Sequence, residues 1–215
     1  MAKLRAHNIA VSLDGFMAGP DQSREDPLGV GGERLHTWIF ETQAGLQMAG
    51  QEGGSTGLDN DFVRLGTEGI GATIMGRNMF GPIRGEWGVE PWRGWWGDDP
   101  PFHHPVFVLT HHPRPSIAME GGTTFHFVEG IQQALQRAVD AAGGADVRLG
   151  GGAATIRQYL RAGLLDELHV AIVPVLLGGG ERVFEDVGDA ADGYEVARFE
   201  ASPAVLHAVL VRSAG

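Results

Sequence analysis

The second half of the chain changes repeatedly between two hydrophobic periods. Short apolar runs at 106–109, 125–128 and 146–149 are typical of buried strands. At 131–142 and 153–162, apolar residues recur every three or four positions, which predicts helices. Strands that alternate with helices indicate a mostly parallel sheet with helices on both faces. A Ser-Pro turn joins the final two strands into an antiparallel edge, and the last three strands are predicted at 166–173, 194–201 and 205–212.

The first half has a less regular pattern. A strand at 3–11 ends in the turn signal Ser12-Leu13-Asp14-Gly15. Helices are predicted at 33–48 and 59–67, where Asp59-Asn60-Asp61 offers side chains that could cap the second helix. The strand Ile70–Met75 leads into a further short helix. Loops are expected at 19–32, 49–57 and 81–104.

The 81–104 loop is the longest segment without a predicted element. It holds four of the five tryptophans, at positions 87, 92, 95 and 96. A structureless loop of this length in a compact domain is usually functional. Its 85–97 segment is interpreted either as a lid that stacks on a planar substrate or as a contact between protomers, with the contact slightly favoured.

Composition and charge narrow the range of partners. The 215 residues fit one domain, 1–215. The net charge is −11 and Lys3 is the only lysine, so no basic stripe exists and nucleic acid is not expected as a partner. The absence of cysteine excludes disulfides, thiolate zinc sites and cysteine nucleophiles. With no targeting segment and no long apolar run, we expect a cytoplasmic protein that does not enter membranes.

Three consecutive glycines, Gly150 to Gly152, lie between the strand at 146–149 and the helix at 153–162. Glycine at the start of a helix lets backbone N–H groups approach an anion, and the helix dipole favours negative charge there. The triplet therefore indicates a phosphate site. A tight turn without a ligand is the alternative, because the full G-x-G-x-x-G spacing is missing.

Four signals occur in a familiar order: Ser12-x-Asp14-Gly15, Met75-Gly76-Arg77-Asn78, Leu149-Gly150-Gly151-Gly152, and Asp166-Glu167-Leu168-His169 followed by Pro174 to Gly180. Together they resemble the dihydrofolate reductase family. The closer resemblance is to the branch typified by the C-terminal reductase domain of the bifunctional riboflavin-biosynthesis protein. It covers roughly residues 4–212. It implies a three-layer α/β fold with a mixed, mostly parallel sheet and an antiparallel C-terminal edge.

The resemblance also implies NADPH as the cofactor. Gly76 and Arg77 would contact its diphosphate or its adenosine phosphate, although a plain turn and a surface cation are the alternative. Thr110 and Arg114 follow the strand where related reductases contact the ribose 2′-phosphate. The chain departs from the family there, because two histidines follow Thr110. The residues expected to meet the pyrophosphate are Gly150, Gly151, Gly152, Ala153 and Thr155.

The substrate side has three candidate catalytic residues. In the riboflavin-type branch Ser12 and Asp14 lie beside the nicotinamide pocket, although Asp14-Gly15 is also an ordinary turn signal. In dihydrofolate reductase a helix carboxylate helps to deliver a proton, and Asp61 or Asp59 occupies that general position here. Helix capping is the alternative for both aspartates. A carboxylate with a raised pKa, or an ordered water, is the expected proton source.

The resulting hypothesis is an NADPH-dependent reductase of a small pyrimidine-like or pterin-like heteroaromatic compound, of the kind used in riboflavin biosynthesis, and a homodimer. One alternative is dihydrofolate or pterin reduction, and another is a non-catalytic protein that senses NADP. A ribosylamino-pyrimidine would need a cation for its phosphate, for which Arg84 and Arg93 are candidates. A zinc deaminase is excluded because the chain has no cysteine. No metal is expected, since no carboxylate or thiolate pattern accompanies the clustered histidines at 103, 104, 111 and 112.

Overall fold

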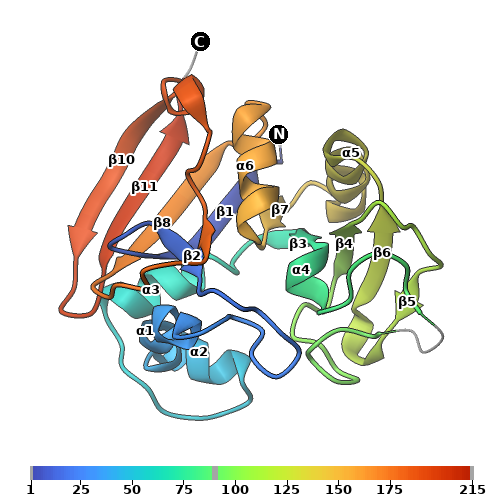
Figure 1. Ribbon diagram of the computed structural model, residues 1–215, viewed down its shortest axis with the longest axis horizontal. Coiled ribbons are helices and arrows are strands. Elements are labelled where there is room, and N and C mark those ends of the chain that lie inside the picture. The colour runs from blue at the N-terminus through green and yellow to red at the C-terminus, as the bar shows by residue number, and fades with distance from the viewer. Residues whose placement is uncertain (1, 89–91, 214–215) are drawn as a thin grey trace.

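The computed structural model describes residues 2–88 and 92–213. In this part of the chain, nine strands form one sheet and two more form a small separate sheet (Figure 1). The main sheet contains β1 (Leu4–Ser12), β3 (Ile70–Gly76), β4 (Pro105–Leu109), β5 (Ile117–Ala118), β6 (Thr124–Val128), β7 (Asp146–Leu149), β8 (Glu167–Val173), β10 (Tyr194–Ala201) and β11 (Leu206–Arg212). The small sheet pairs β2 (Phe16–Ala18) with β9 (Glu181–Arg182).

The strand order is β10-β11-β8-β1-β7-β3-β4-β6-β5. The six central strands, from β8 to β6, run parallel to their neighbours. β10 and β11 continue the sheet in antiparallel fashion at one edge. The predicted mixed sheet with an antiparallel C-terminal edge is therefore confirmed. β5, a two-residue antiparallel strand at the other edge, is too short to give a periodic signal in the sequence.

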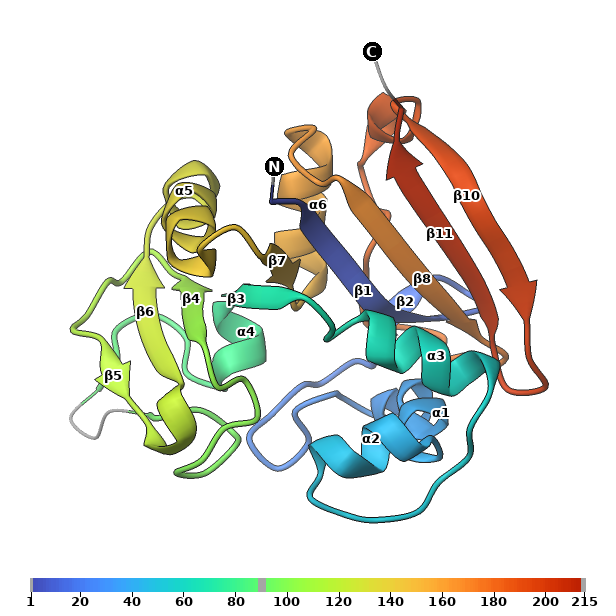
Figure 2. The same ribbon diagram turned by 180° about the vertical axis from the view of Figure 1, so that it is seen from behind.

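The α-helices are α1 (Thr37–Phe40), α2 (Gln43–Met48), α3 (Leu58–Leu65), α4 (Arg77–Phe80), α5 (Ile131–Ala142) and α6 (Ala153–Arg161), with 3₁₀ turns η1 (Gly32–Leu35), η2 (Glu120–Gly122) and η3 (Gly188–Ala191). α5 and α6 pack on one face of the sheet over a cluster of buried aliphatic side chains. On the other face, α1 to α3 cover the strands nearest β8, as Figure 2 shows from behind. The tryptophan-rich loop covers β3, β4 and β6 on that same face. The expected three layers are present.

The prediction of one continuous helix at 33–48 is wrong. The structure divides this segment into η1, α1 and α2. The Thr42 hydroxyl donates to the Ile39 carbonyl at 2.6 Å and accepts from the Gly45 N–H at 3.0 Å, so Thr42 caps a new helix instead of continuing the old one. A Cβ at Gly45 would lie 1.9 Å from the Ile39 carbonyl oxygen, and only glycine permits this sharp turn.

Candidate active-site cavity

A cavity of about 610 Å³ opens where β3, β4 and β7 end. In a parallel sheet the carboxyl ends of the strands and the amino ends of the following helices meet at one edge, which is where such folds bind ligands. Eight of the nine residues predicted to bind the cofactor line this cavity. They are Gly76, Arg77, Thr110, Gly150, Gly151, Gly152, Ala153 and Thr155.

The wall of the cavity depends on two glycine turns in direct contact. The Gly76 N–H donates to the Gly151 carbonyl at 2.8 Å, and the Gly150 N–H donates to the Ile74 carbonyl at 2.8 Å. A Cβ at Gly76 would lie 2.3 Å from the Thr155 hydroxyl oxygen. Gly151 has a φ of 130°, which side-chain-bearing residues rarely adopt. The turns after β3 and β7 can therefore touch only because both positions are glycine.

The amino end of α6 presents free backbone donors to the cavity. Gly152 is the N-cap and provides no side-chain cap, and its carbonyl accepts from the Thr155 and Ile156 N–H groups. A Cβ at Gly152 would meet nothing within 4 Å, so the space in front of it is open. Within the described residues, no acceptor pairs with the N–H groups of Ala153 and Ala154. These donors and the helix dipole make this end of α6 suited to an anion.

Arg77 extends the positive side of the cavity toward the end of β4. Its Nη1 donates to the Thr110 hydroxyl at 3.3 Å, and its guanidinium lies 3.8 Å from the centre of the Trp87 ring. Burial lowers the pKa of Arg77, and the charge of Arg84 adds to this effect while Glu86 opposes it. Nε and Nη2 of Arg77 are buried without an acceptor among the described residues. Arg77 therefore retains donors that an anionic ligand could satisfy.

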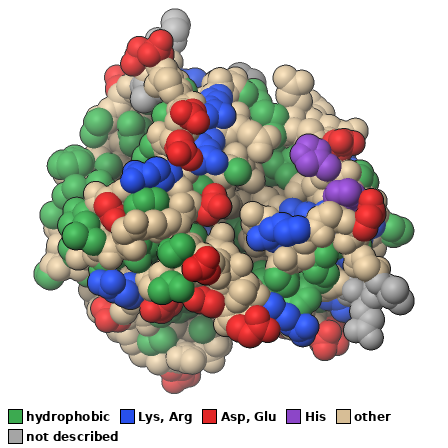
Figure 3. All heavy atoms as spheres, in the orientation of Figure 1, with side chains coloured by type: hydrophobic (Ala, Val, Ile, Leu, Met, Phe, Trp, Pro, Cys, Tyr) green, Lys and Arg blue, Asp and Glu red, His purple; other side chains and the backbone are tan. Residues whose placement is uncertain are grey.

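Figure 3 shows basic and histidine side chains close together on the right half of the face seen in Figure 1. His111 and His112, which follow Thr110, line the cavity together with Arg84. Glu181 is the sole carboxylate in the described lining. Although the chain carries a net charge of −11, this cavity therefore has a locally positive lining.

Arg114 lies outside the described lining of the cavity. Its guanidinium stacks 3.8 Å from the centre of the Trp87 ring and 4.1 Å from that of Phe127, and it donates to the Trp92 carbonyl. Burial, and secondarily the charge of Arg77, lowers the pKa of Arg114 to about 10. Arg114 thus supports the ring on which Arg77 rests.

Ser12 and Asp14 lie next to the cavity, outside its described lining. Asp14 accepts hydrogen bonds from the Ser12 hydroxyl at 2.6 Å, the Gly178 N–H at 2.7 Å and the Leu177 N–H at 3.2 Å. The Ser12 bond is the main cause that lowers the pKa of Asp14 to about 2. Asp14 therefore does not provide the carboxylate of raised pKa that was expected. It ties the turn after β1 to the Pro174–Gly180 segment, and β2 follows directly with Met17 and Ala18 in the cavity wall.

Asp61 is exposed on α3, away from the described cavity lining, and Asp59 lies in the same helical turn. The expectation that either caps the helix is wrong, because the N-cap is Gly57 and receives no side-chain hydrogen bond. Asp59 instead accepts from His207 Nε2 at 2.8 Å. The carboxylate thus belongs to a buried network and not to a helix end.

This network, called the histidine chain below, consists of the Asn8 amide, His169, His207 and Asp59. The Asn8 N–H donates to His169 Nδ1 at 3.1 Å, so that nitrogen accepts and Nε2 of His169 carries the proton. His169 Nε2 then donates to His207 Nδ1 at 3.0 Å, and His207 Nε2 donates to Asp59. Phe62 stacks on both rings, with ring centres 4.5 Å from His169 and 4.0 Å from His207. Every ring nitrogen of the two histidines therefore has a partner.

Several cavity residues were missed by the sequence interpretation. Met17 and Ala18 were expected only as an apolar run after a turn, and His36 only as part of a helix. Burial lowers the pKa of His36, and its Nδ1 is buried without a described partner. A lone histidine within a helical pattern carries no sequence signal of a site. Further lining residues from the predicted loops are Gln22, Pro27, Leu28, Gly85, Trp95 and Trp96.

The described tryptophans of the 85–97 segment pack on their own chain. Trp92 donates to the Phe80 carbonyl at 2.9 Å, and Trp96 lies 4.9 Å from Phe102 between ring centres. Trp95 and Trp96 also line the cavity. Residues 89–91 of this segment lie outside the described part of the chain. The loop is therefore part of a hydrophobic cluster and of the cavity wall.

Two further properties concern metals and membranes. Nowhere in residues 2–88 and 92–213 do three or more histidine, aspartate or glutamate side chains gather in a way that could hold a metal ion. No helix in these same residues has the length and apolar character needed to span a membrane.

The sequence profile of the RibD C-terminal domain family matches residues 6–206, nearly the whole chain. The protein belongs to this family. A search of curated protein sequences gave no significant match.

Several solved structures resemble this RibD C-terminal domain protein over nearly the full length of both chains. A protein from Shewanella sp. PV-4 that carries a riboflavin-biosynthesis name is 22% identical with a TM-score of 0.62, and each chain covers 100% of the other. A pyrimidine reductase-like protein from Corynebacterium diphtheriae is 13% identical with a TM-score of 0.57, over 100% of this chain and 93% of that one. These likenesses establish the fold.

Dihydrofolate reductase from Enterococcus faecalis, solved with NADP(H) and RAB-propyl, is 15% identical with a TM-score of 0.50, over 99% of this chain and 97% of that one. The fold is therefore that of dihydrofolate reductase, as the four sequence signals implied. The family and the fold together support the assignment of this protein as a reductase.

Proposed function

We propose that this RibD C-terminal domain protein is an NADPH-dependent reductase that transfers hydride to a small pyrimidine-like or pterin-like heteroaromatic compound. One observation carries the proposal. The 610 Å³ cavity combines two glycine turns, an uncapped helix start and the unpartnered nitrogens of Arg77 in one wall. These are donors for phosphate groups, and a dinucleotide has phosphates to match them.

The residues fit the two phosphate-bearing parts of the cofactor, its pyrophosphate and its ribose 2′-phosphate. The Gly76–Arg77 turn and the Ala153 and Ala154 amides would hold the pyrophosphate, because both lie in the cavity wall. Arg77, Thr110 and the following histidines would hold the ribose 2′-phosphate, which favours NADPH over NADH. Arg114 acts as a positioning residue through Trp87. When bound, the reduced nicotinamide supplies a hydride.

The substrate would enter beside β2, between the 19–36 segment and the tryptophan-rich loop. Met17 and Ala18 on one side and Trp95 and Trp96 on the other give the cavity apolar surfaces for a flat ring and exclude water from it. Ser12 and Asp14 hold β2 in place and are positioning residues in this proposal. Asp61 receives no role in proton transfer.

A substrate that carries a phosphate would meet a cation in the same cavity. Arg84 lines the cavity and donates to the Gly81 carbonyl at 3.1 Å, which leaves other guanidinium nitrogens for a phosphate. Arg93 instead contacts the Met119 sulfur at 3.5 Å, outside the described lining. Arg84 is therefore the stronger candidate for recognising a ribosylamino-pyrimidine phosphate.

Glu181, the carboxylate of the described lining, is the candidate protein source of the proton. Glu181 belongs to β9, which pairs with β2 beside Ala18. His36 serves as the comparison, because burial lowers its pKa and a neutral imidazole has no acidic proton to deliver. Comparing the pH profiles of Glu181→Gln and His36→Gln with the wild-type profile tests whether Glu181 delivers the proton.

The decisive experiment titrates NADPH and NADH separately while tryptophan fluorescence is followed. Trp95 and Trp96 line the cavity, so binding should quench them. We expect NADPH to bind at least about tenfold more tightly than NADH, because charged hydrogen bonds to the extra phosphate are lost with NADH. Oxidation of NADPH is then followed with pyrimidine candidates and with dihydrofolate. Absence of binding by either nucleotide would overturn the proposal, and binding without oxidation of any substrate would favour an NADP sensor.

A homodimer is the proposed assembly. The edge strand β10 exposes 63% of Val196 and 64% of Phe199. Apolar side chains on an open sheet edge are a typical protein contact. Light scattering should give the mass of two chains for the wild type and of one chain for Phe199→Glu. A wild-type mass of one chain would contradict this assignment.

A further inference from the structure

A second hollow, of about 180 Å³, lies on the face of the sheet opposite α5 and α6. It is well below the usual size of a site for a drug-sized ligand. Its described lining comes from three parts of the chain: the segment from α3 into β3, the segment just before β4, and β7. The lining residues are Thr67, Ile70, Pro101, Phe102, His104 and Arg148. We call it the Arg148 hollow.

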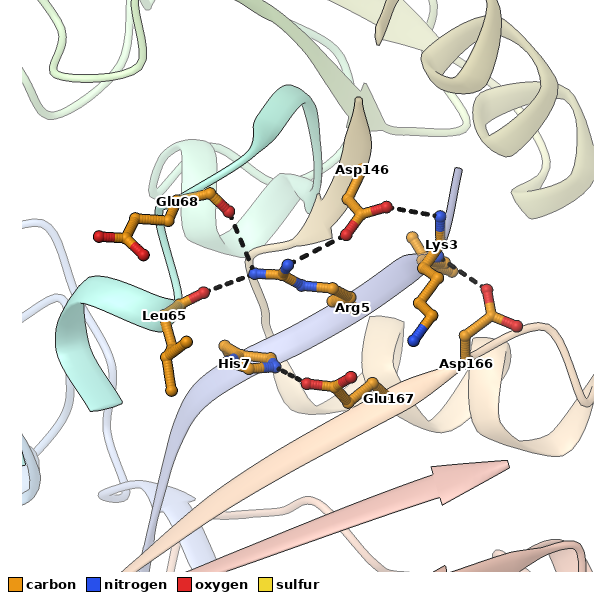
Figure 4. A network of polar contacts seen from close by, with 9 residues as sticks. Lys3, Arg5, His7, Leu65, Glu68, Asp146, Asp166 and Glu167 are labelled. Atoms are coloured by element: carbon orange, nitrogen blue, oxygen red, sulfur yellow. Dashed lines mark hydrogen bonds and ion pairs between the residues drawn. The ribbon is translucent and has the colours of Figure 1, made fainter. Parts of the chain in front are cut away.

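The strand register explains why an arginine has no counter-charge here. Arg148 on β7 pairs with Arg5 on β1 and with Thr73 on β3, and paired residues of neighbouring parallel strands point to the same face. Two arginines thus lie side by side. The nearby Asp146 carboxylate already accepts hydrogen bonds from Arg5 Nη1 at 3.0 Å and from the Lys3 N–H at 2.8 Å (Figure 4).

A second acid of this region, Glu68, also has partners already. Glu68 binds Arg64 Nη2 through its carboxylate at 2.5 Å, and its backbone carbonyl accepts from Arg5 (Figure 4). Among the described residues, Arg148 makes no side-chain hydrogen bond, and its Nε is buried without a partner. Arg148 is one of the residues that line the hollow. A guanidinium in this position is costly unless something supplies the missing negative charge.

The remaining lining suits an anion. His104 Nε2 and the Thr73 hydroxyl are 2.8 Å apart, so His104 is held at the wall of the hollow by a hydrogen bond. The Thr67 hydroxyl already donates to the Arg64 carbonyl at 3.0 Å, and the described lining contains no carboxylate that would repel an anion. We propose that the Arg148 hollow binds a small oxyanion, of the phosphate or carboxylate class, through the Arg148 guanidinium. A nucleotide is too large for it.

The test compares thermal unfolding in inorganic phosphate with unfolding in sodium chloride of equal ionic strength. We expect the midpoint of the wild-type protein to rise with phosphate and to saturate, because a ligand that binds only the folded state stabilises it. In Arg148→Met the apparent Kd should weaken at least about tenfold. The matched control, Arg77→Gln in the large cavity, should keep the saturable rise.

Two further results separate the hollow from a general effect of salt. In chloride alone, Arg148→Met should unfold at the wild-type temperature or above it, because an unpaired buried charge has been removed. In the wild type, phosphate should shift the amide resonances of Thr67 and His104, a measurement that needs no variant. Because phosphate can also bind in the large cavity, the shifts at Thr67 and His104 decide the matter: their absence in the wild type, or their persistence in Arg148→Met, overturns the proposal. A repeat with acetate shows whether carboxylates bind as well as phosphate.

Discussion

The cavity wall and the histidine chain both contain buried polar groups, and they differ in how these groups are satisfied. In the wall, Nε and Nη2 of Arg77 and the first amides of α6 have no partner among the described residues. Under α3, both ring nitrogens of His169 and His207 are hydrogen-bonded within the chain. Unsatisfied groups at a cavity indicate a ligand, whereas a completed network indicates structure. Buried polar groups therefore have different meanings in the two regions.

Phe62→Ala should produce the largest effect on the histidine-chain side. Phe62 is fully buried and stacks on both histidine rings. Removing it leaves a cavity, and we expect unfolding free energy to fall by about 3–5 kcal/mol. Denaturant unfolding measures the loss, while NADPH affinity of the folded protein stays within about twofold because the sites share no contact. A large change in affinity with little change in stability would reverse the roles assigned to the two regions.

Arg77→Gln should change NADPH affinity strongly and stability little, the reverse of Phe62→Ala. We expect NADPH to bind about 100-fold more weakly, because charge-assisted bonds to phosphate are lost. The unfolding free energy should stay unchanged or rise, since the lost guanidinium has two unpartnered buried nitrogens. Fluorescence titration and denaturant unfolding give the two quantities. Arg161→Gln is the control, because Arg161 binds backbone carbonyls at Glu185 and Asp186 outside the described cavity lining. Equal effects of both variants on affinity would contradict the assignment.

Lowering the pH should weaken the histidine chain. Burial, with the nearby His7 and His207, lowers the pKa of His169 to about 2. The folded pKa is below the unfolded value of about 6.5, so the unfolded state binds more protons in this range. Stability from His169 is complete above about pH 6.5 and falls by about 1.4 kcal/mol per pH unit below it. Unfolding in denaturant at several pH values measures this slope, and His169→Gln should flatten it by about one proton. An unchanged slope would show that His169 is not held neutral.

Asp59→Asn and Asp61→Asn form a matched pair on one helix, with the smallest expected effects. Asp59→Asn removes the charged partner of His207 and should lower the unfolding free energy by about 1–2 kcal/mol. Asp61 is exposed, and Asp61→Asn should change the unfolding free energy by less than about 0.5 kcal/mol. Neither should change NADPH oxidation. A loss of activity in Asp61→Asn alone would give Asp61 the proton-transfer role that the sequence suggested.

The candidate site was predictable where it depends on local backbone chemistry. Glycines at 76 and 150–152 follow clear strand patterns and precede helices, and the structure brings these turns to one cavity. The acidic candidates were less predictable. Ser12-Asp14 and Asp59-Asp61 both carry turn or helix-start signals, but side-chain partners distant in sequence decide what they do. Asp14 meets Gly178, and Asp59 meets His207.

Hydrophobic periodicity and the glycine positions predict the order of strands and helices, the parallel sheet and the glycine turns, because both act through neighbouring residues. Which polar groups are satisfied depends instead on how distant parts of the chain pack together. Arg114 became a support for Trp87, Asp59 became the end of the histidine chain, and Arg148 was left without a counter-charge. Hydrogen bonds and burial depend on strand register and on contacts between residues that lie far apart in the sequence, such as Asp59 and His207. No pattern of neighbouring residues in the sequence predicts those contacts.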